Sequence, residues 1–347
     1  MLNIPNLRLR NGAPPCEFSL GRGETCVLLG RNNSGKTNLL RLVAGLRGQA
    51  SGDVDIDSGS VEPGSRPQSP AAFVFQAFVN YPHWTVRQNL ESPLRAVRMK
   101  ARDREERVQR VANSLQITEL LERLPAQLSG GQQQRVALGR ALCKQAPIVL
   151  LDEPFVNLDF RLRERLTNEL ASLLRETNTS ALFATSDSRD AFALGNRVAL
   201  LADHQLIQTG QPIDVYTQPD SLLAADLMSE PGVNYTPMAN GVCAVRPEHL
   251  SLAERAGSHK FVLQVGAVET NGSHSFVQGR LCMHADAAGN THAVRELPPT
   301  KHSPPWVAKL IGVPEVALGA TLSLYVHPDN LLNFAGTSFQ QVGRGIG

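Results

Sequence analysis

The stretch G-R-N-N-S-G-K-T, from Gly30 to Thr37, decides the fold of this chain. It follows an apolar run at 26–29 and precedes a leucine-rich segment at 39–44, an order that predicts a strand, a glycine loop and a helix. Glycines let the loop turn its N–H groups inward, and the helix N-terminus adds partial positive charge there. We therefore expect a phosphate-binding loop, with Lys36 on the β- and γ-phosphates and the Thr37 hydroxyl on Mg²⁺.

Length and composition restrict the function classes. The 347 residues suggest two domains, and a net charge of +2 provides no general field that would favour nucleic acid. Five scattered cysteines favour free thiols in a reducing cytosol over a disulfide framework or a zinc site. We expect no signal peptide at the start and no membrane-spanning run of about 20 apolar residues, so any membrane role would go through a partner.

Polar residues follow two of the predicted strands. Gln76 ends a short apolar strand at 72–75, and Asp152 and Glu153 end a continuous apolar strand at 148–151. Carboxylates at the carboxyl ends of parallel strands line the ligand crevice of an open α/β sheet. We expect Asp152 to hold Mg²⁺ through water and Glu153 to orient and deprotonate the attacking water. The alternative is a strand that ends in a turn with two exposed acids.

The stretch L-S-G-G-Q, residues 128–132, predicts a helix start. Ser129 and Gln132 have capping-box spacing, so we expect a helix from Ser129 to about Cys143. Capping alone explains both residues. However, Gly130 and Gly131 leave the helix N-terminus without covering side chains, and such an end can approach an anion closely.

The pattern of predicted helices and strands changes near Asn234. Before it, helical patterns alternate with strands, including an apolar strand at 181–184. After it, short strand-like segments lie between Gly, Pro, Asn and His turns, which is typical of a β-rich domain. We therefore predict domains at 1–232 and 233–347, with a helical subdomain at about 85–140.

In their order and spacing, the loop, Gln76, L-S-G-G-Q and Leu150-Leu151-Asp152-Glu153-Pro154 resemble the ABC-type ATPases. Phe155 to Asp159 is similar to the D-loop of that family. The resemblance covers the whole chain, and the segments 81–86 and 245–250 are most similar to carbohydrate-importer ATPases. The segments 78–82, 157–163 and 184–186 are similar to a bacterial glycerol importer that uses two different ATPase chains. The resemblance implies an α/β P-loop NTPase fold with a mixed sheet and a helical subdomain, followed by a small OB-like regulatory domain.

The resemblance also implies a dimeric motor on the cytoplasmic face of a bacterial inner membrane. ATP on one loop would be closed over by the L-S-G-G-Q helix of the other subunit, and two transmembrane permease subunits and, indirectly, a solute-binding protein would be partners. A surface around Phe78, Tyr81 and Trp84 would receive a permease helix, although internal packing would also explain aromatic residues there. The implied nucleotide contacts are Gly30, Asn32, Asn33, Ser34, Gly35, Lys36, Thr37, Asn38, Ser129, Gly130, Gly131 and Gln132. The implied catalytic residues are Glu153, Gln76, Ser186 and Asp159, and the implied Mg²⁺ ligands are Thr37, Gln76 and Asp152.

Two features of the family pattern are missing. The family places a histidine that contacts the γ-phosphate where this chain has Ser186, and loss of one such donor commonly costs about 2.7–4 kcal/mol of transition-state stabilisation. The family also stacks adenine on an aromatic residue near the N-terminus. Here the first aromatic residue is Phe18, at a core strand position, so stacking of about 1–3 kcal/mol is expected to be absent.

These departures lead to a functional hypothesis with alternatives. We predict an ATPase subunit for uptake of a small polyol or sugar, with glycerol favoured, in an asymmetric pair whose other subunit does most of the hydrolysis. A homodimeric importer of sugar, glycerol-3-phosphate or polyamine remains an alternative, as does a regulatory binding role for the C-terminal domain. A soluble ABC ATPase acting on DNA or ribosomes is disfavoured, because no inserted coiled coil or tandem motor domain is present.

Overall fold

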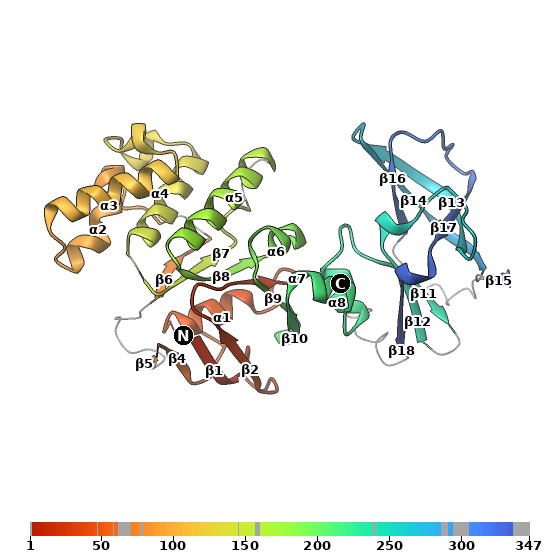
Figure 1. The fold of residues 1–347 in the computed structure, drawn as a ribbon, viewed down its shortest axis with the longest axis horizontal. Coiled ribbons are helices and arrows are strands. Elements are labelled where there is room, and N and C mark those ends of the chain that lie inside the picture. The colour runs from red at the N-terminus through yellow and green to blue at the C-terminus, as the bar shows by residue number, and fades with distance from the viewer. Residues whose placement is uncertain are drawn as a thin grey trace. The chain divides into compact units, whose positions relative to one another are not determined.

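A computed structural model describes residues 2–46, 48–57, 59–61, 71–76, 79–144, 146–156, 160–238, 241–285, 291–293 and 305–335. The chain forms two compact units, Met1–Thr217 and Gln218–Gly347 (Figure 1). Among the described helices, none is both long enough and apolar enough to cross a membrane.

The division between the units lies earlier than the boundary expected after residue 232. Helix α8 (Leu222–Leu227) and the turn after it belong to the second unit. Asp226 Oδ1 accepts a hydrogen bond from Val233 N at 3.1 Å, and Arg246 Nε donates one to Ser229 Oγ at 3.0 Å. The change in sequence pattern marks the first strand of the second unit, but it cannot show that a short helix before that strand is bonded to it.

The described elements of the first unit follow one another along the chain in a mostly alternating order. They are β1 (Leu2–Leu7), β2 (Cys16–Leu20), β3 (Thr25–Leu29), α1 (Lys36–Val43), β4 (Val54–Ile56), β5 (Gly59–Val61), β6 (Ala71–Val74), α2 (Val86–Ala96), α3 (Ala101–Ser114), η1 (Thr118–Leu120), η2 (Pro125–Gln127), α4 (Gly130–Cys143), β7 (Ile148–Asp152), α5 (Phe160–Glu176), β8 (Ser180–Thr185), α6 (Ser188–Leu194), β9 (Arg197–Ala202), β10 (Gln205–Gly210) and α7 (Pro212–Thr217).

The central sheet of this unit has the strand order β10-β9-β3-β8-β7-β6. The neighbours from β9 to β6 are parallel, and β10 pairs antiparallel with β9, so the sheet is mixed as predicted. Strands β3, β7 and β8 are buried along their full length, because helices cover both faces of the sheet. Figure 1 shows α1 on one side of the sheet and α5 and α6 on the other.

A second sheet, with the order β2-β1-β4-β5, packs against the same core. Ile4 of β1, Phe18 of β2 and Leu40 of α1 meet in this core. Phe18 is only 3% exposed. Its ring is therefore a core group, which is the position that the sequence indicated.

The helical subdomain consists of α2, α3 and α4, and capping boxes begin two of these helices. Thr85 caps α2 together with Gln88, and Ser129 caps α4 together with Gln132. The sequence predicts both boxes, because Thr85 to Gln88 has the same capping-box spacing as Ser129 to Gln132. Helix α4 crosses α2 and α3 closely at Gly139, where the absence of a side chain leaves room for Leu90 and Leu115.

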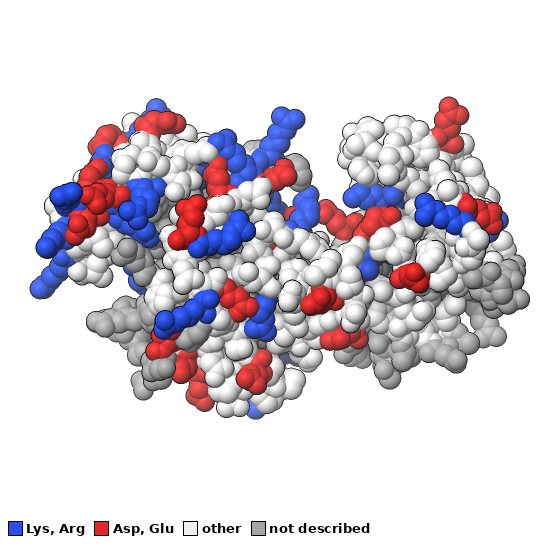
Figure 2. Space-filling view, in the orientation of Figure 1, with Lys and Arg blue, Asp and Glu red and all other residues white. Residues whose placement is uncertain are grey.

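Charged side chains of both signs are intermixed over the helical subdomain (Figure 2). Arg87 forms ion pairs with Glu105 and Glu122, and Arg95 pairs with Glu91 within α2. Positive charge on these helices is therefore locally neutralised, in agreement with the small net charge of the chain.

The second unit is built mainly from strands. After α8 come β11 (Asn234–Met238), β12 (Gly241–Val245), η3 (Pro247–His249), β13 (His259–Thr270), β14 (His274–Ala285), β15 (Thr291–Ala293), β16 (Trp306–Ile311), β17 (Thr321–Val326), η4 (Pro328–Asn330) and β18 (Leu331–Ala335). One sheet has the order β11-β12-β18, and the other has the order β15-β14-β13-β17 with β16 also on β14. Phe261, Trp306 and Leu324 lie in a core of its own, so the β-rich class predicted for this region is confirmed.

The close approach of the helices at Gly139 generates a stability prediction. A Cβ at this position would lie 2.7 Å from Leu90 Cδ2 and 3.1 Å from Leu115 Cδ1. We expect Gly139→Leu to lower the stability of the first unit by about 1–3 kcal/mol or more through overpacking. The measurement is the midpoint of thermal unfolding. Gly48→Ala is the control, since a Cβ there approaches only Arg41 Cβ at 3.9 Å, and an equal shift from both variants would contradict the prediction.

Candidate nucleotide site

The register of the central sheet brings the predicted site residues to one edge. Leu29 at the end of β3 pairs with Thr185 of β8, and Asp152 of β7 pairs with Ala184. On the other side of β7, Val74 pairs with Leu151. The loop after β3, the residues after β8, the two acids at the end of β7 and the residues after β6 therefore lie side by side at the carboxyl ends of the strands.

The loop between β3 and α1 takes a conformation that its sequence permits. Asn33 and Gly35 have φ values of 63° and 106°, so the chain turns through the left-handed region twice. Glycine adopts such angles freely, and asparagine tolerates them better than most residues. Gly30 is needed for a different reason: a Cβ there would lie 2.3 Å from the Leu201 carbonyl oxygen.

Lys36 is enclosed by its own loop. Its side chain is 4% exposed, and Nζ donates hydrogen bonds to the carbonyl oxygens of Gly30 at 2.7 Å and Arg31 at 2.9 Å. Nζ also lies 3.4 Å from Glu153 Oε1. Burial lowers the pKa of Lys36 below its ordinary value, and the Glu153 carboxylate opposes that shift. A buried ammonium group inside a ring of loop carbonyls is suited to an anionic ligand that enters the loop.

Thr37 and Asp152 are paired across the sheet edge. Thr37 Oγ1 donates a hydrogen bond to Asp152 Oδ1 at 3.0 Å. Asp152 is 5% exposed, and burial raises its pKa, which the hydrogen bond from Thr37 partly opposes. A hydroxyl beside a carboxylate is an oxygen donor set that fits Mg²⁺, which proteins usually hold with one or two carboxylates and phosphate oxygens.

The loop also contains a buried hydroxyl without a partner. Ser34 Oγ is buried and makes no hydrogen bond in the structure. Buried polar atoms are usually satisfied, so an orphaned one calls for an explanation such as a bound group. Its position inside the glycine loop, next to Lys36, agrees with a phosphate-binding role.

Glu153 is held in a strained conformation at the end of β7. Its φ is 45°, and its N–H donates to the Ala184 carbonyl oxygen at 3.0 Å. Its side chain is largely buried and points to Lys36. A non-glycine residue with positive φ that is fixed from both sides is a feature of functional sites.

The other predicted residues differ in how closely they join this group. Gln76 lies just beyond β6 and is exposed, and Ser186 lies just beyond β8 and is also exposed. Asn32 and Asn33 are exposed on the loop, while Asn38 Nδ2 donates to the Leu9 carbonyl oxygen at 3.3 Å. Asp159 and Phe78 lie outside the described residues.

The L-S-G-G-Q residues are not part of this group within one chain. Ser129 to Gln132 begin α4, which packs on α2, α3 and β6. A Cβ at Gly130 would meet nothing within 4 Å, so this helix end is open on its outer side. The resemblance in sequence assigns these residues to the nucleotide of a partner chain, and that assignment stays a prediction.

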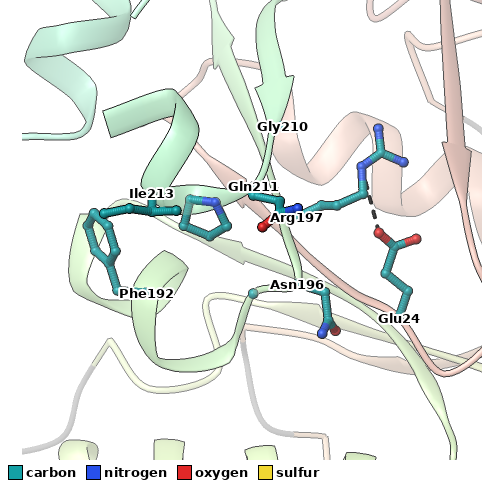
Figure 3. Close-up of a pocket in the computed structure, with 9 residues that line it drawn as sticks. Glu24, Phe192, Asn196, Arg197, Gly210, Gln211 and Ile213 are labelled. Carbon is teal, nitrogen blue, oxygen red and sulfur yellow. Dashed lines mark ion pairs between the residues drawn. The ribbon is translucent and has the colours of Figure 1, made fainter. Parts of the chain in front are cut away.

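A hollow in the first unit lies at the opposite end of the sheet. It has a volume of about 830 Å³ and lies where β3 and β9 begin, so it is separate from the phosphate loop. Figure 3 shows Phe192 and Ile213 on one side of it, with Arg197 and Glu24 paired on the other. The pair is joined at 3.7 Å, and Arg197 also donates to the Ser19 carbonyl oxygen and to Thr209 Oγ1. The charges that line the hollow are therefore satisfied by the protein itself.

Some residues that hold the site in place carry no signal in the sequence. The Thr185 carbonyl oxygen accepts from Gly30 N at 3.3 Å, and the Thr185 side chain belongs to a buried cluster with Asp190 and Arg163. The hydrogen bond between the Gly30 and Thr185 backbones leaves no signal in the sequence. The cluster leaves none either, because its residues come from two helices and a strand end that are separate in the chain. By contrast, asparagine inside a glycine loop was a readable signal for the left-handed turn at Asn33.

Comparison with known proteins identifies relatives that span three quarters or more of the chain. The sn-glycerol-3-phosphate import ATP-binding protein UgpC of Rhodopseudomonas palustris (strain BisB5) is 34% identical over 346 residues, which cover 94% of this chain and 93% of that protein. The trehalose import ATP-binding protein SugC of Mycobacterium tuberculosis (strain ATCC 25618 / H37Rv) is 32% identical over 296 residues, or 75% of each chain.

A family model and a solved structure agree with these relatives. Residues 14–156 match the family model described as ABC transporter. The dimeric post-hydrolysis state of the ATP-binding cassette MJ0796, bound to ADP and Pi, is similar with a TM-score of 0.54 and 26% identity, over 61% of this chain and 99% of that one. The predicted P-loop NTPase fold is thereby confirmed. Because its similarity to import ATP-binding proteins extends over almost its entire length, this chain belongs to the ABC transporter family as an ATP-binding subunit with ATPase activity.

Proposed function

We propose that this chain binds ATP and Mg²⁺ at the Gly30–Thr37 loop and drives uptake of a small polyol or sugar, with glycerol favoured. The observation that carries the nucleotide site is the buried Lys36 ammonium, which loop carbonyls enclose and which lies beside Glu153. The next residue, Thr37, is hydrogen-bonded to Asp152. The importer role is supported by the similarity to proteins named for import of sn-glycerol-3-phosphate and of trehalose. Both solutes carry hydroxyl groups, as glycerol does.

The roles of the loop and of the acids follow from their positions. When nucleotide enters, Lys36 exchanges its contacts with Gly30 O and Arg31 O for phosphate oxygens, at little desolvation penalty because it is already buried. Thr37 and Asp152 would hold Mg²⁺, which supplies charge neutralisation to the phosphates. Glu153 accepts the proton of the attacking water, and Gln76 orients that water from the neighbouring strand end. Asp159 would act across the dimer interface.

Ser186 is the weak position of the proposed site. It lies beyond β8, at the edge where the loop and Glu153 meet, and its hydroxyl donates a single hydrogen bond without positive charge. A histidine side chain at this position would reach farther and would carry charge when protonated. We therefore propose an asymmetric pair with a second ATPase chain, in which the L-S-G-G-Q helix of this chain closes the more active site on the partner. A homodimer that tolerates serine is the alternative.

The proposed partners include two permease subunits, which would bring this chain to the cytoplasmic face of the membrane as a peripheral subunit. Tyr81 and Trp84 form an exposed aromatic pair, with ring centroids 4.6 Å apart and exposed fractions of 45% and 42%. Asn89, which is fully buried, holds this loop through the Tyr81 N–H and the carbonyl oxygens of Tyr81, Trp84 and Thr85. A rigid loop with exposed amphipathic rings is suited to receiving a short helix.

A second candidate function is regulation by the second unit. The unit has its own core around Phe261, Trp306 and Leu324, so it does not depend on the nucleotide site for its fold. Such a unit is suited to sensing a solute or a protein. This role is compatible with the ATPase function.

The first test restores the missing side chain. We expect Ser186→His to raise hydrolysis at this chain's own site by about tenfold or more, because an added donor stabilises the charge that develops in the transition state. Turnover of the assembled transporter is measured with the partner's site disabled. Ser186→Ala is the control and should change little. No gain from histidine would contradict the proposal that Ser186 limits this site.

The second test compares the two sites of the pair. Glu153→Gln here should reduce transporter ATPase activity much less than the matching substitution in the partner chain, because most turnover occurs on the partner's loop. Both variants are measured in otherwise identical complexes. Equal losses would exclude the asymmetry and favour the homodimer-like account.

The third test removes the second unit. A chain ending at Thr217 keeps the loop, Asp152 and Glu153, so it should bind ATP with unchanged affinity. In the assembled transporter we expect uptake to continue but to lose its response to solute. Complete loss of uptake, with the complex still assembled, would instead show that the second unit has a structural role.

A further inference from the structure

The end of strand β8 holds two separate parts of the nucleotide site. Gly30 N donates to the Thr185 carbonyl oxygen at 3.3 Å, and Glu153 N donates to the Ala184 carbonyl oxygen at 3.0 Å. One bond fixes the first residue of the phosphate loop, and the other fixes the carboxylate at the end of β7. The position of this strand end therefore determines how far Glu153 stands from the loop.

The strand end is itself fixed through the Thr185 side chain. Thr185 Oγ1 donates to Asp190 Oδ2 at 2.6 Å and accepts from Asp187 N at 3.1 Å. Both Thr185 and Asp190 are almost fully buried, with exposed fractions of 4% and 3%. Ser186 lies between two residues that are held in this way.

Arg163 closes the cluster from helix α5. Its Nη2 lies 2.6 Å from Asp190 Oδ2 and 3.2 Å from Asp187 Oδ2. Asp187 is also paired with Arg189 at 2.7 Å. A buried carboxylate such as Asp190 requires a partner, and the planar guanidinium serves both acids at once.

We infer that Arg163 is a positioning residue for the nucleotide site, acting through Asp190 and Thr185 on Gly30, Glu153 and Ser186. Its hydrogen bonds and ion pairs go to Thr185, Asp187 and Asp190 rather than to the described residues of the predicted site, so its contribution is to hold the strand end at the distance that hydrolysis needs. The inference rests on the proposed nucleotide function, because the group that it positions is the proposed one. Through these contacts Arg163 connects helix α5 (Phe160–Glu176) to the proposed phosphate-binding loop.

The competing account is that Arg163 only ties α5 to α6. The helix provides a matched comparison in Arg165, which pairs with Glu169 at 3.0 Å on the exposed side of α5. Both arginines form ion pairs from one helix, but only Arg163 reaches the end of β8. Helix attachment alone predicts no change at Gly30 or Glu153 when Arg163 is lost.

The test uses the full chain and backbone amide exchange. Arg163→Met alone leaves Asp190 buried without its charge partner. The Arg163→Met/Asp190→Asn double variant avoids this buried charge and so keeps the protein folded, while it removes the ion pair between Arg163 and Asp190 that clamps the end of β8. We expect faster hydrogen exchange at the amides of Gly30 and Glu153, with exchange in β3 before Gly30 unchanged. Arg165→Met should change neither amide. Unchanged exchange at both amides in the folded double variant would overturn the inference.

Kinetics of the assembled transporter provide a second readout, with Ser186→His in the background so that this chain's site contributes. The double variant should lower kcat by about tenfold to a hundredfold, because small displacements of catalytic groups are costly, while KM for ATP changes little. Arg163→Lys should recover part of kcat, since an ammonium can still pair with Asp190. A kcat equal to that of the parent would overturn the inference. A Lys36→Ala chain that still binds ATP at full affinity would instead contradict the proposed function.

Discussion

The parallel hydrogen bonding of β3 to β8 is the constraint on which the site depends. Leu29 pairs with Thr185, so the loop that begins at Gly30 must emerge beside the residues that follow β8. Both strands are buried on both faces, and their register runs from Thr25 opposite Ala181 to Leu29 opposite Thr185. A slip of one residue would move Gly30 away from the Thr185 carbonyl oxygen and Glu153 away from the loop.

Burial of charge gives this edge of the sheet its chemistry. Lys36, Asp152 and Glu153 lie within one small region, and each is partnered by the protein: loop carbonyls for Lys36, Thr37 for Asp152, and the Lys36 ammonium for Glu153. Burial disfavours the charged forms of Lys36 and Asp152, which is why their pKa values move toward each other. An incoming phosphate chain with its cation would supply charges opposite to those of Lys36 and Asp152.

The residues of the loop and the two acids have the contacts expected of a nucleotide site, whereas two other positions of the family pattern do not. Those contacts are made by Lys36, Thr37, Asp152 and Glu153, while Ser186 occupies an exposed position and Phe18 is committed to the core. The buried cluster of Arg163, Asp190 and Thr185 nevertheless holds the Ser186 segment firmly. The proposal that binding at this site is separated from rapid hydrolysis depends on the short hydroxyl side chain at this tightly held position.

The sequence by itself determined the strand–loop–helix unit, both capping boxes, the buried central strands and the β-rich character of the second unit. These features depend on residues that are close in the chain, where spacing, glycine and apolar periodicity act directly. Only the tertiary structure decided the division at Thr217 and the clamp of Arg163 on the end of β8. The division and the clamp depend on bonds between residues from different elements, and the register that joins those elements is selected by the packing of the whole core.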